Sequence, residues 1–192
     1  MPKDKLKIHF ATTNRSKFLE AQSVMKEYGI RLIFLGKKGL EIQSDNLEEI
    51  AKQSAIASST DMRISTIAED AGLFIDPLRG FPGPYSSFVF RTLGCDGILK
   101  LLKGSHNRKA RFVSAVAYCD PLHLPICFSA VSEGFVGTGT RGTSGFGFDP
   151  IFIPLENGKK TFAEMSSIEK NRYSHRARAF RKFGKWSIRS KP

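Results

Sequence analysis

The 192 residues carry 30 Lys and Arg against 18 Asp and Glu, a net charge of +12, and 41% of them are hydrophobic. This is the composition of a globular protein with a full core, and no apolar run of about 18 residues predicts a membrane span. Residues 1–7 are too polar for a signal peptide, and three cysteines without metal-ligand spacing argue against a zinc site. We therefore expect a cytoplasmic protein with no membrane partner.

The N-terminal half alternates between strand and helix. Asn14 can cap a first helix that Gly29 ends, and Asp45 with Glu48 three residues later predicts the start of a second helix. The predicted elements are strands over residues 6–12, 31–35 and 65–68, and helices over residues 14–29 and 45–61. Strand, helix and strand in succession predict an α/β unit with a parallel sheet.

The C-terminal half adds an antiparallel pattern. After the rigid Gly-Phe-Pro-Gly-Pro turn at residues 80–84, the predicted elements are helices over residues 85–93, 96–102 and 177–183 and strands over residues 111–118, 126–136 and 149–153. Together the two halves predict an α/β fold with a twisted mixed sheet flanked by helices. A cleft between the parallel part and the hairpin is the expected ligand site.

The C-terminal end is strongly basic. Residues 159–192 contain eleven Lys and Arg against two Glu, which accounts for +9 of the net charge and attracts polyanions. Within this segment Lys170, His175 and Arg176 are closely spaced donors, and Ser174 can cap the helix that follows. This cluster predicts a binding site for an acidic ligand; the alternative is a solvated basic face.

The first strand-to-helix junction is a second candidate site. Its polar residues are Thr12, Thr13, Asn14, Arg15, Ser16 and Lys17. Backbone N–H groups at a helix N-terminus bind anions, and Lys17, one turn after Asn14, can reach the same anion. The segment is not a Walker P-loop. The alternative is simple capping by Asn14 with Lys17 in solvent.

Two adjacent carboxylates, Glu69 and Asp70, follow the third predicted strand. On a strand they face opposite ways, so one can be structural while the other points into the cleft. With Glu41 as a possible partner, Asp70 predicts a Mg²⁺ site completed by substrate phosphate oxygens. The alternative is a salt bridge to one of the many cations.

The Gly-rich segment over residues 142–150 is the last candidate. A formal Gly-x-Gly-x-x-Gly match at residues 137–142 is followed by loop and strand, not helix, so it is not a dinucleotide fingerprint. Its glycines, Gly147 among them, allow close backbone approach to a flat ligand. Phe146 or Phe148 can stack on a base and Asp149 can accept from N–H groups. The alternative is aromatic core beside a turn.

Taken in order, these segments resemble the inosine triphosphate pyrophosphatases, also called non-canonical purine nucleoside triphosphate pyrophosphatases. Any one motif is weak, but the ordered set is specific and covers nearly the whole chain. The chain departs from the family pattern at Thr13 in place of Gly, Ala71 in place of Ser and Phe148 in place of Tyr or Trp. The matching segments are residues 12–17, 69–73, 80–86, 145–150, 161–165, 169–171 and 174–176.

The resemblance implies hydrolysis of ITP, dITP and XTP to the monophosphate and pyrophosphate, with Mg²⁺, by a homodimer. It implies one elongated domain over residues 1–192 with two lobes and the active cleft between them. Asp70 and Lys17 are the expected catalytic residues, and Glu41 and Asp70 the expected metal ligands. The expected substrate-binding residues are Thr12, Thr13, Asn14, Arg15, Ser16, Lys17, Ala71, Phe146, Gly147, Phe148, Asp149, Lys170, His175 and Arg176.

Two other functions fit parts of the chain. A Maf-like nucleotide pyrophosphatase would share the reaction, but the Ser-His-Arg segment at residues 174–176 argues against it. A nucleic-acid-binding module would use residues 172–191, where Phe180, Phe183 and Trp186 interleave with basic residues. Because the spacing of three also makes a helical core stripe, we do not expect nucleic acid as a partner.

Overall fold

The computed structural model describes residues 6–189. Most of the polar N-terminal segment, and Lys191 at the end of the basic segment, lie outside the described residues. The described part is an α/β fold, as predicted. Its elements are β1 (Lys7–Phe10), α1 (Arg15–Lys26), β2 (Arg31–Phe34), α2 (Leu47–Met62), β3 (Thr66–Ile75), η1 (Asp76–Leu78), β4 (Pro82–Gly83), α3 (Ser86–Thr92), α4 (Gly94–Leu101), β5 (Lys109–Cys119), β6 (Ile126–Val136), β7 (Phe152–Pro154), η2 (Phe162–Glu164), α5 (Ser167–Tyr173) and α6 (His175–Arg189).

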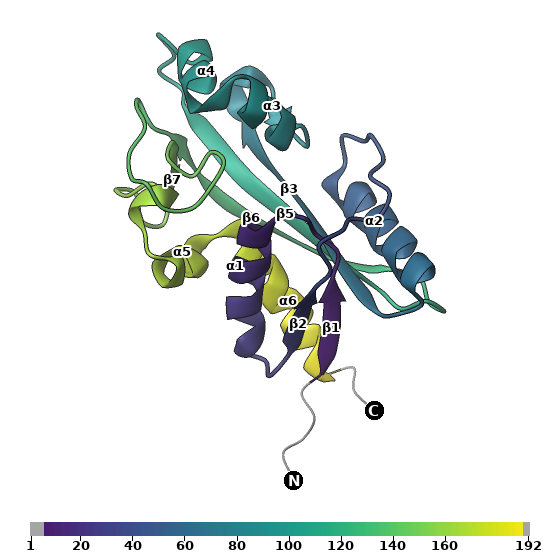
Figure 1. The fold of residues 1–192 in the computed structure, drawn as a ribbon. Coiled ribbons are helices and arrows are strands. Elements are labelled where there is room, and N and C mark those ends of the chain that lie inside the picture. Colours follow the sequence, from purple (N-terminus) through teal and green to yellow (C-terminus); the bar gives the residue numbers. More distant parts are fainter. Residues whose placement is uncertain (1–5, 190–192) are drawn as a thin grey trace. The chain divides into compact units, whose positions relative to one another are not determined.

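The strands of the described part hydrogen-bond in the order β2-β1-β3-β5-β6-β7, with β4 attached to β3 (Figure 1). Pairing of β1 with β2 and β3 is parallel, whereas β4 on β3 and β7 on β6 are antiparallel, so the sheet is mixed as expected. The chain divides into two compact units. Within the described residues, unit 1 comprises residues 6–70, 114–130 and 176–189, and unit 2 comprises residues 71–113 and 131–175.

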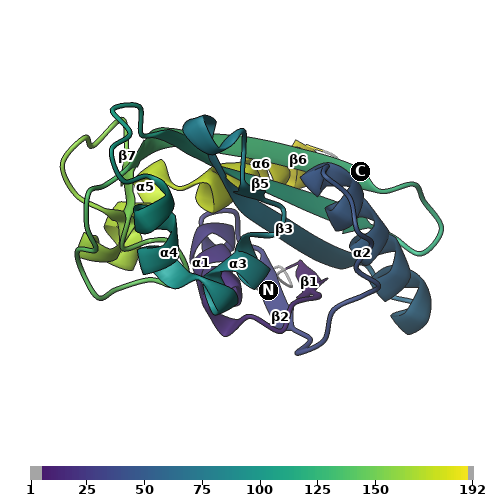
Figure 2. The same cartoon turned by 90° about the horizontal axis from the view of Figure 1, so that it is seen from above.

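In unit 1, α1 and α6 lie side by side against the parallel strands (Figure 1). Asn14 caps α1 as predicted, because its side chain accepts from the Lys17 N–H at 3.0 Å. The core between these helices and β1 is aromatic: the Phe10 and Phe180 rings meet edge to face with centroids 5.5 Å apart. The helix α2 covers the other face of the strands (Figure 2). Helices on both faces are what parallel strands require.

Two expectations for unit 1 are wrong in detail. The residue that caps α2 is Asn46, not Asp45, because the Asn46 side chain accepts from the Glu48 N–H at 2.9 Å. The third strand does not end before Glu69, because it runs on to Ile75. Its second half pairs with β4, and β3 is also hydrogen-bonded to β5 in the sheet. The two adjacent carboxylates therefore lie within a strand.

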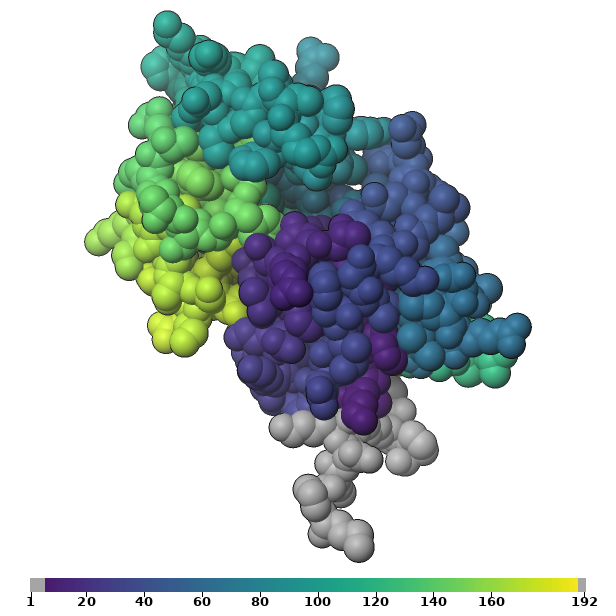
Figure 3. Space-filling view, viewed as in Figure 1, coloured from purple at the N-terminus to yellow at the C-terminus, as the bar shows by residue number. Residues whose placement is uncertain are grey.

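Unit 2 has its own core, formed by α3, α4 and the strand segments β3, β5, β6 and β7. The last predicted strand begins later than expected, at Phe152 rather than Asp149. The reason is local: the N–H of Asp149 bonds the Phe146 carbonyl and the N–H of Ile151 bonds the Phe148 carbonyl, which makes a turn. This turn holds the Gly-rich segment beside α3 and α4, and the two surfaces adjoin in Figure 3.

The aromatic residues of α6 belong to the core. Phe180 and Phe183 are completely buried, and Trp186 packs against the same cluster. They cannot serve as a stacking platform for single-stranded nucleic acid, so that alternative loses its main support. None of the helices within residues 6–189 combines the length and apolar character needed to cross a bilayer.

Candidate active site

The N-terminus of α1 presents donors and hydroxyls at the end of β1. Thr12 is buried and accepts from the Asn14 N–H at 3.1 Å, whereas Thr13, Arg15 and Ser16 are exposed. Free N–H groups of the first turn, together with the helix dipole, favour an anion at this end of α1. The Lys17 side chain does not extend into solvent, since it is only 13% exposed. Simple capping with a solvated lysine is therefore not what this segment forms.

The Lys17 ammonium lies between the two carboxylates of β3. Its Nζ is 2.9 Å from Oε2 of Glu69 and 4.0 Å from Oδ1 of Asp70. Glu69 has no exposed side-chain surface, whereas Asp70 keeps 17% of its side chain exposed. The expectation that one of the two acids is structural and the other accessible fits this difference in burial.

Glu69 is bound from three elements. Its Oε1 accepts from the Ser114 hydroxyl of β5 at 2.7 Å and from Arg176 Nε of α6 at 3.0 Å, while Lys17 of α1 faces Oε2. Burial alone would raise the pKa of Glu69, but the positive charges of Arg176 and Lys17 outweigh it and hold the pKa at about 2. Glu69 is therefore an anion at neutral pH, and the salt bridge expected as an alternative to a metal is formed by Glu69.

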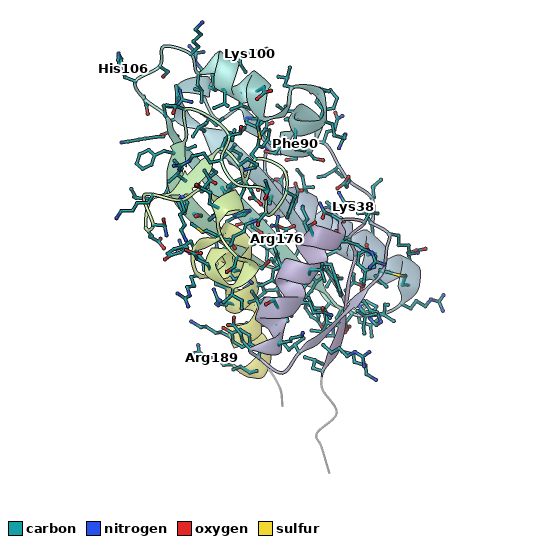
Figure 4. The ribbon with its side chains drawn as sticks, turned by 60° about the vertical axis from the view of Figure 1, so that its left-hand side comes forward. Lys38, Phe90, Lys100, His106, Arg176 and Arg189 are labelled. Carbon is teal, nitrogen blue, oxygen red and sulfur yellow. The ribbon has the colours of Figure 1, made fainter. Side chains whose placement is uncertain are left out.

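Arg176 lies at the start of α6 (Figure 4) and is 3% exposed. Besides Glu69, its guanidinium donates through Nη1 to Glu20 of α1 at 2.6 Å. Sequence reasoning overlooked Glu20, because its position on α1 gives no sign of a partner 156 residues away. Arg176 is thus held by two carboxylates in unit 1, whereas its chain neighbour His175 belongs to unit 2.

The predicted metal ligand Glu41 lies between β2 and α2. Its carboxylate is ion-paired with Lys38, which Figure 4 labels, and half of its side chain is exposed. Within residues 6–189 no group of three or more His, Cys, Asp and Glu is arranged to hold a metal ion. A metal at this end of unit 1 would therefore depend on few protein carboxylates.

In unit 2 the 145–150 turn is built around Asp149. Its Oδ2 accepts from the Phe146 N–H at 2.8 Å and from Lys170 Nζ at 2.6 Å, and both side chains of the ion pair are 4% exposed. Gly145 is required here, because its φ is +75° and a Cβ would stand 2.1 Å from Asp149 Oδ2. The Lys170 ammonium also lies 5.0 Å from the centre of the Phe146 ring.

The two candidate stacking residues differ in exposure. Phe148 is 3% exposed and meets the ring of Phe90 edge to face at 5.4 Å, so it is part of the core. Phe146 is partly exposed.

A cavity of about 300 Å³ adjoins this turn and is lined by Phe90, Cys95 and Gly147 among others. Burial raises the pKa of the Cys95 thiol to about 11, so the thiol is neutral.

His175 is buried against aromatic rings. Its imidazole stacks on Phe112 with the centres 4.6 Å apart and the planes at 8°, and Phe162 lies 6.5 Å away. Phe112 is a partner of His175 that sequence reasoning did not find. In the sequence it is one apolar position in an alternating strand, and no local signal links β5 to the start of α6. Of the remaining expected contacts, Ala71 lies within β3 and is partly exposed.

Comparisons with known proteins show to which family the chain is similar. A profile of the Ham1 family matches residues 8–186. The chain is 46% identical over 181 residues to a dITP/XTP pyrophosphatase of Methanopyrus kandleri, covering 94% of this chain and 96% of that one. A protein of the same name from Saccharolobus solfataricus is 47% identical, with 94% and 93% covered.

Solved structures show the same fold. The Ham1 protein of Staphylococcus aureus superimposes with a TM-score of 0.83 at 26% identity, covering 96% of this chain and all of that one. A HAM1 protein from Coxiella burnetii gives a TM-score of 0.84 at 27% identity, with the same coverage. Sequence and structure together confirm the resemblance of the ordered motifs, and the chain belongs to the Ham1 family.

Proposed function

We propose that this chain is a nucleoside triphosphate pyrophosphatase that hydrolyses non-canonical purine nucleotides, namely ITP, dITP and XTP, to the monophosphate and pyrophosphate. The relatives named above are dITP/XTP pyrophosphatases and match this chain over nearly its full length. The observation that carries the proposal is the position of the Lys17 ammonium between Glu69 and Asp70, at the N-terminus of α1. This places a cation, helix N–H donors and an accessible carboxylate together, as attack on a phosphate requires.

In the proposed reaction a water attacks the α-phosphorus and pyrophosphate leaves. Asp70 accepts the proton of that water, since it is the accessible carboxylate of the pair. Lys17 and the N–H groups of residues 15 and 16 stabilise the negative charge that develops on the phosphate oxygens. Thr12 is buried and bonded to the Asn14 N–H, and so stabilises the turn in which these donors lie.

The carboxylates present fit Mg²⁺. Mg²⁺ commonly takes one or two carboxylates and fills its other positions with water and substrate phosphate oxygens, so a cluster of three protein ligands is not needed. Asp70 would hold the ion, with Glu41 as second ligand after release from Lys38. When bound, Mg²⁺ polarises the phosphate oxygens and lowers the pKa of coordinated water. Glu69 is a poor ligand, because Lys17, Arg176 and Ser114 surround it.

For base recognition we propose the group built around the 145–150 turn. Hypoxanthine and xanthine carry a 6-keto acceptor where adenine carries an amino donor, so donors from Lys170, His175 or the loop backbone favour the keto purines. Phe146 is the partly exposed aromatic ring that can stack on the base, and Gly147 lets the backbone approach it. Arg176, expected from the sequence to share this role, is proposed to contribute through its ion pairs instead.

The test is release of pyrophosphate from dITP, XTP and dATP by the purified protein with Mg²⁺. We expect dITP and XTP to be hydrolysed with a kcat/KM at least about a hundredfold above that for dATP. Asp70→Asn should abolish most turnover while leaving dITP binding largely intact, because it removes the base and keeps the shape. Equal hydrolysis of dATP would contradict the proposed specificity, and near-normal turnover of Asp70→Asn would contradict the base assignment.

The homodimer and the cytoplasmic location are part of the same proposal. All three cysteines are free thiols, which suits a reducing compartment. Light scattering of the purified protein tests the dimer: we expect about twice the chain mass of 21.4 kDa.

A further inference from the structure

Glu69 is a buried acid that the proposed chemistry leaves without a role. It neither binds the metal nor accepts the proton, yet it is fully buried and ionised in unit 1. Burying a carboxylate is costly unless several partners compensate, and this one has an ammonium, a guanidinium and a hydroxyl around it. An arrangement of this cost, next to the proposed catalytic pair, calls for a specific function.

The contacts form an alternating chain of charges. Glu20 binds Arg176, Arg176 binds Glu69, Glu69 binds Lys17, and Lys17 lies 4.0 Å from Asp70. All five residues belong to unit 1 and come from α1, β3 and α6. Glu69 lies at the centre of this chain, and it is the member through which α6 is connected to the Lys17 ammonium.

A lysine needs such an anchor more than an arginine does. Its ammonium is a point charge on four flexible carbons, so without a fixed partner it samples many positions. At 2.9 Å from Glu69 the ammonium is held at a position 4.0 Å from the Asp70 carboxylate. The Ser114 hydroxyl and Arg176 in turn hold the Glu69 carboxylate in place.

We propose that Glu69 is a positioning residue, which fixes the Lys17 ammonium beside Asp70 so that it meets the phosphate charge as it develops. This inference rests on the proposed pyrophosphatase function. Because the charge develops fully only in the transition state, loss of the anchor should lower kcat more than it changes KM. A purely structural role would instead lower stability and leave kcat of the folded protein unchanged.

The experiment compares two isosteric variants, Glu69→Gln and Glu20→Gln. Each removes one negative charge and one carboxylate bound to Arg176, and it is Glu69 that forms the 2.9 Å ion pair with Lys17. We expect Glu69→Gln to lose about 100-fold in kcat for dITP with KM little changed, the effect of a misplaced catalytic group. Glu20→Gln should retain at least about tenfold more kcat than Glu69→Gln. Equal losses in the two variants, or a normal kcat in Glu69→Gln, would overturn the proposal.

A double-mutant cycle with Lys17→Ala tests the route of the effect. If Glu69 acts through Lys17, adding Glu69→Gln to Lys17→Ala lowers kcat no further. Independent, multiplying losses would show that Glu69 acts by another route and would also overturn the proposal.

Separate control experiments test whether each variant folds and whether the unmodified protein is active. Circular dichroism and urea unfolding confirm that each variant is folded. If Glu69→Gln is not, Ser114→Ala decides, since it removes one hydrogen bond to Glu69 and leaves every charge. A several-fold fall in its kcat at constant KM supports the proposal, and an unchanged kcat refutes it. Absence of dITP hydrolysis by the unmodified protein would refute the proposed function itself, whereas an active protein with insensitive variants refutes only the positioning role.

Discussion

The buried ion pair of unit 2 allows a quantitative prediction. Lys170 Nζ and Asp149 Oδ2 are 2.6 Å apart and both side chains are 4% exposed, so neither charge is compensated by water. Lys170→Met keeps the length and apolar stem of the side chain but leaves the Asp149 carboxylate without its cation. Removal of one partner of a buried pair costs about 3–5 kcal/mol, because an uncompensated charge remains. Loss of the cation–π contact between Lys170 and Phe146 adds to the loss of stability. The Phe146 N–H still donates to Asp149 and offsets part of that loss.

The matched control is Lys160→Met. Lys160 also pairs with a carboxylate, Glu169, at 3.1 Å, but its side chain is 50% exposed. Such a pair contributes less than about 1 kcal/mol. In urea unfolding followed by circular dichroism, Lys170→Met should lower the midpoint by roughly 1.5–2.5 M, taking a slope of about 2 kcal/mol per M, and Lys160→Met by less than about 0.5 M.

Removal of the second buried charge should restore stability. Adding Asp149→Asn to Lys170→Met removes the remaining buried charge, so the double variant should regain much of the lost stability. The account would be refuted if Lys170→Met and Lys160→Met were equally stable, or if the added Asp149→Asn destabilised the protein further.

Three more predictions concern pH and backbone conformation. The pKa of Glu69 is lowered from 4.5 to about 2, so the contribution of its charge to stability is present above pH 4.5 and is lost as the pH falls towards 2. We expect the urea midpoint of the unmodified protein to fall more steeply over this pH range than that of Glu69→Gln. Equally steep falls would contradict this role of the Glu69 charge. Gly145→Ala should destabilise more than Gly147→Ala, because both have positive φ but only the first places a Cβ against Asp149; equal urea midpoints would contradict this. Asn14→Ala should cost about 1 kcal/mol of stability and raise KM for dITP, since the first turn of α1 loses its cap; unchanged values in both assays would remove the cap from the site.

Much of the fold could be predicted from local patterns. The alternation of strand and helix in the N-terminal half, the Asn14 cap and the core stripe of Phe180 and Phe183 all follow from residues within a few positions of one another. The errors also have local causes. Asp45 and Asn46 are both good caps, and only the helix geometry selected Asn46.

The site could be predicted only as a set of segments. Residues 12–17, the pair Glu69 and Asp70, and the 145–150 turn were each expected to bind ligand, but each had a plausible structural alternative. The salt bridge alternative applied to Glu69, and the core alternative applied to Phe148. Glu69 differs in burial from Asp70, and Phe148 from Phe146, because burial depends on which part of a strand or turn is covered, and that is not a local property.

By itself, the sequence determined the order of most elements, the Asn14 cap and the kinds of chemical group available, because these depend on short-range geometry and composition. Only the tertiary structure decided the partnerships: Lys17 meets Glu69 across 52 positions, and Arg176 meets the same carboxylate across 107. Only the tertiary structure assigns His175 to the ring of Phe112 in one unit and its neighbour Arg176 to two carboxylates in the other. The physical reason is that ion pairs and ring stacks form between whichever side chains the sheet order and helix packing bring together, and the spacing of residues along the chain does not contain that order.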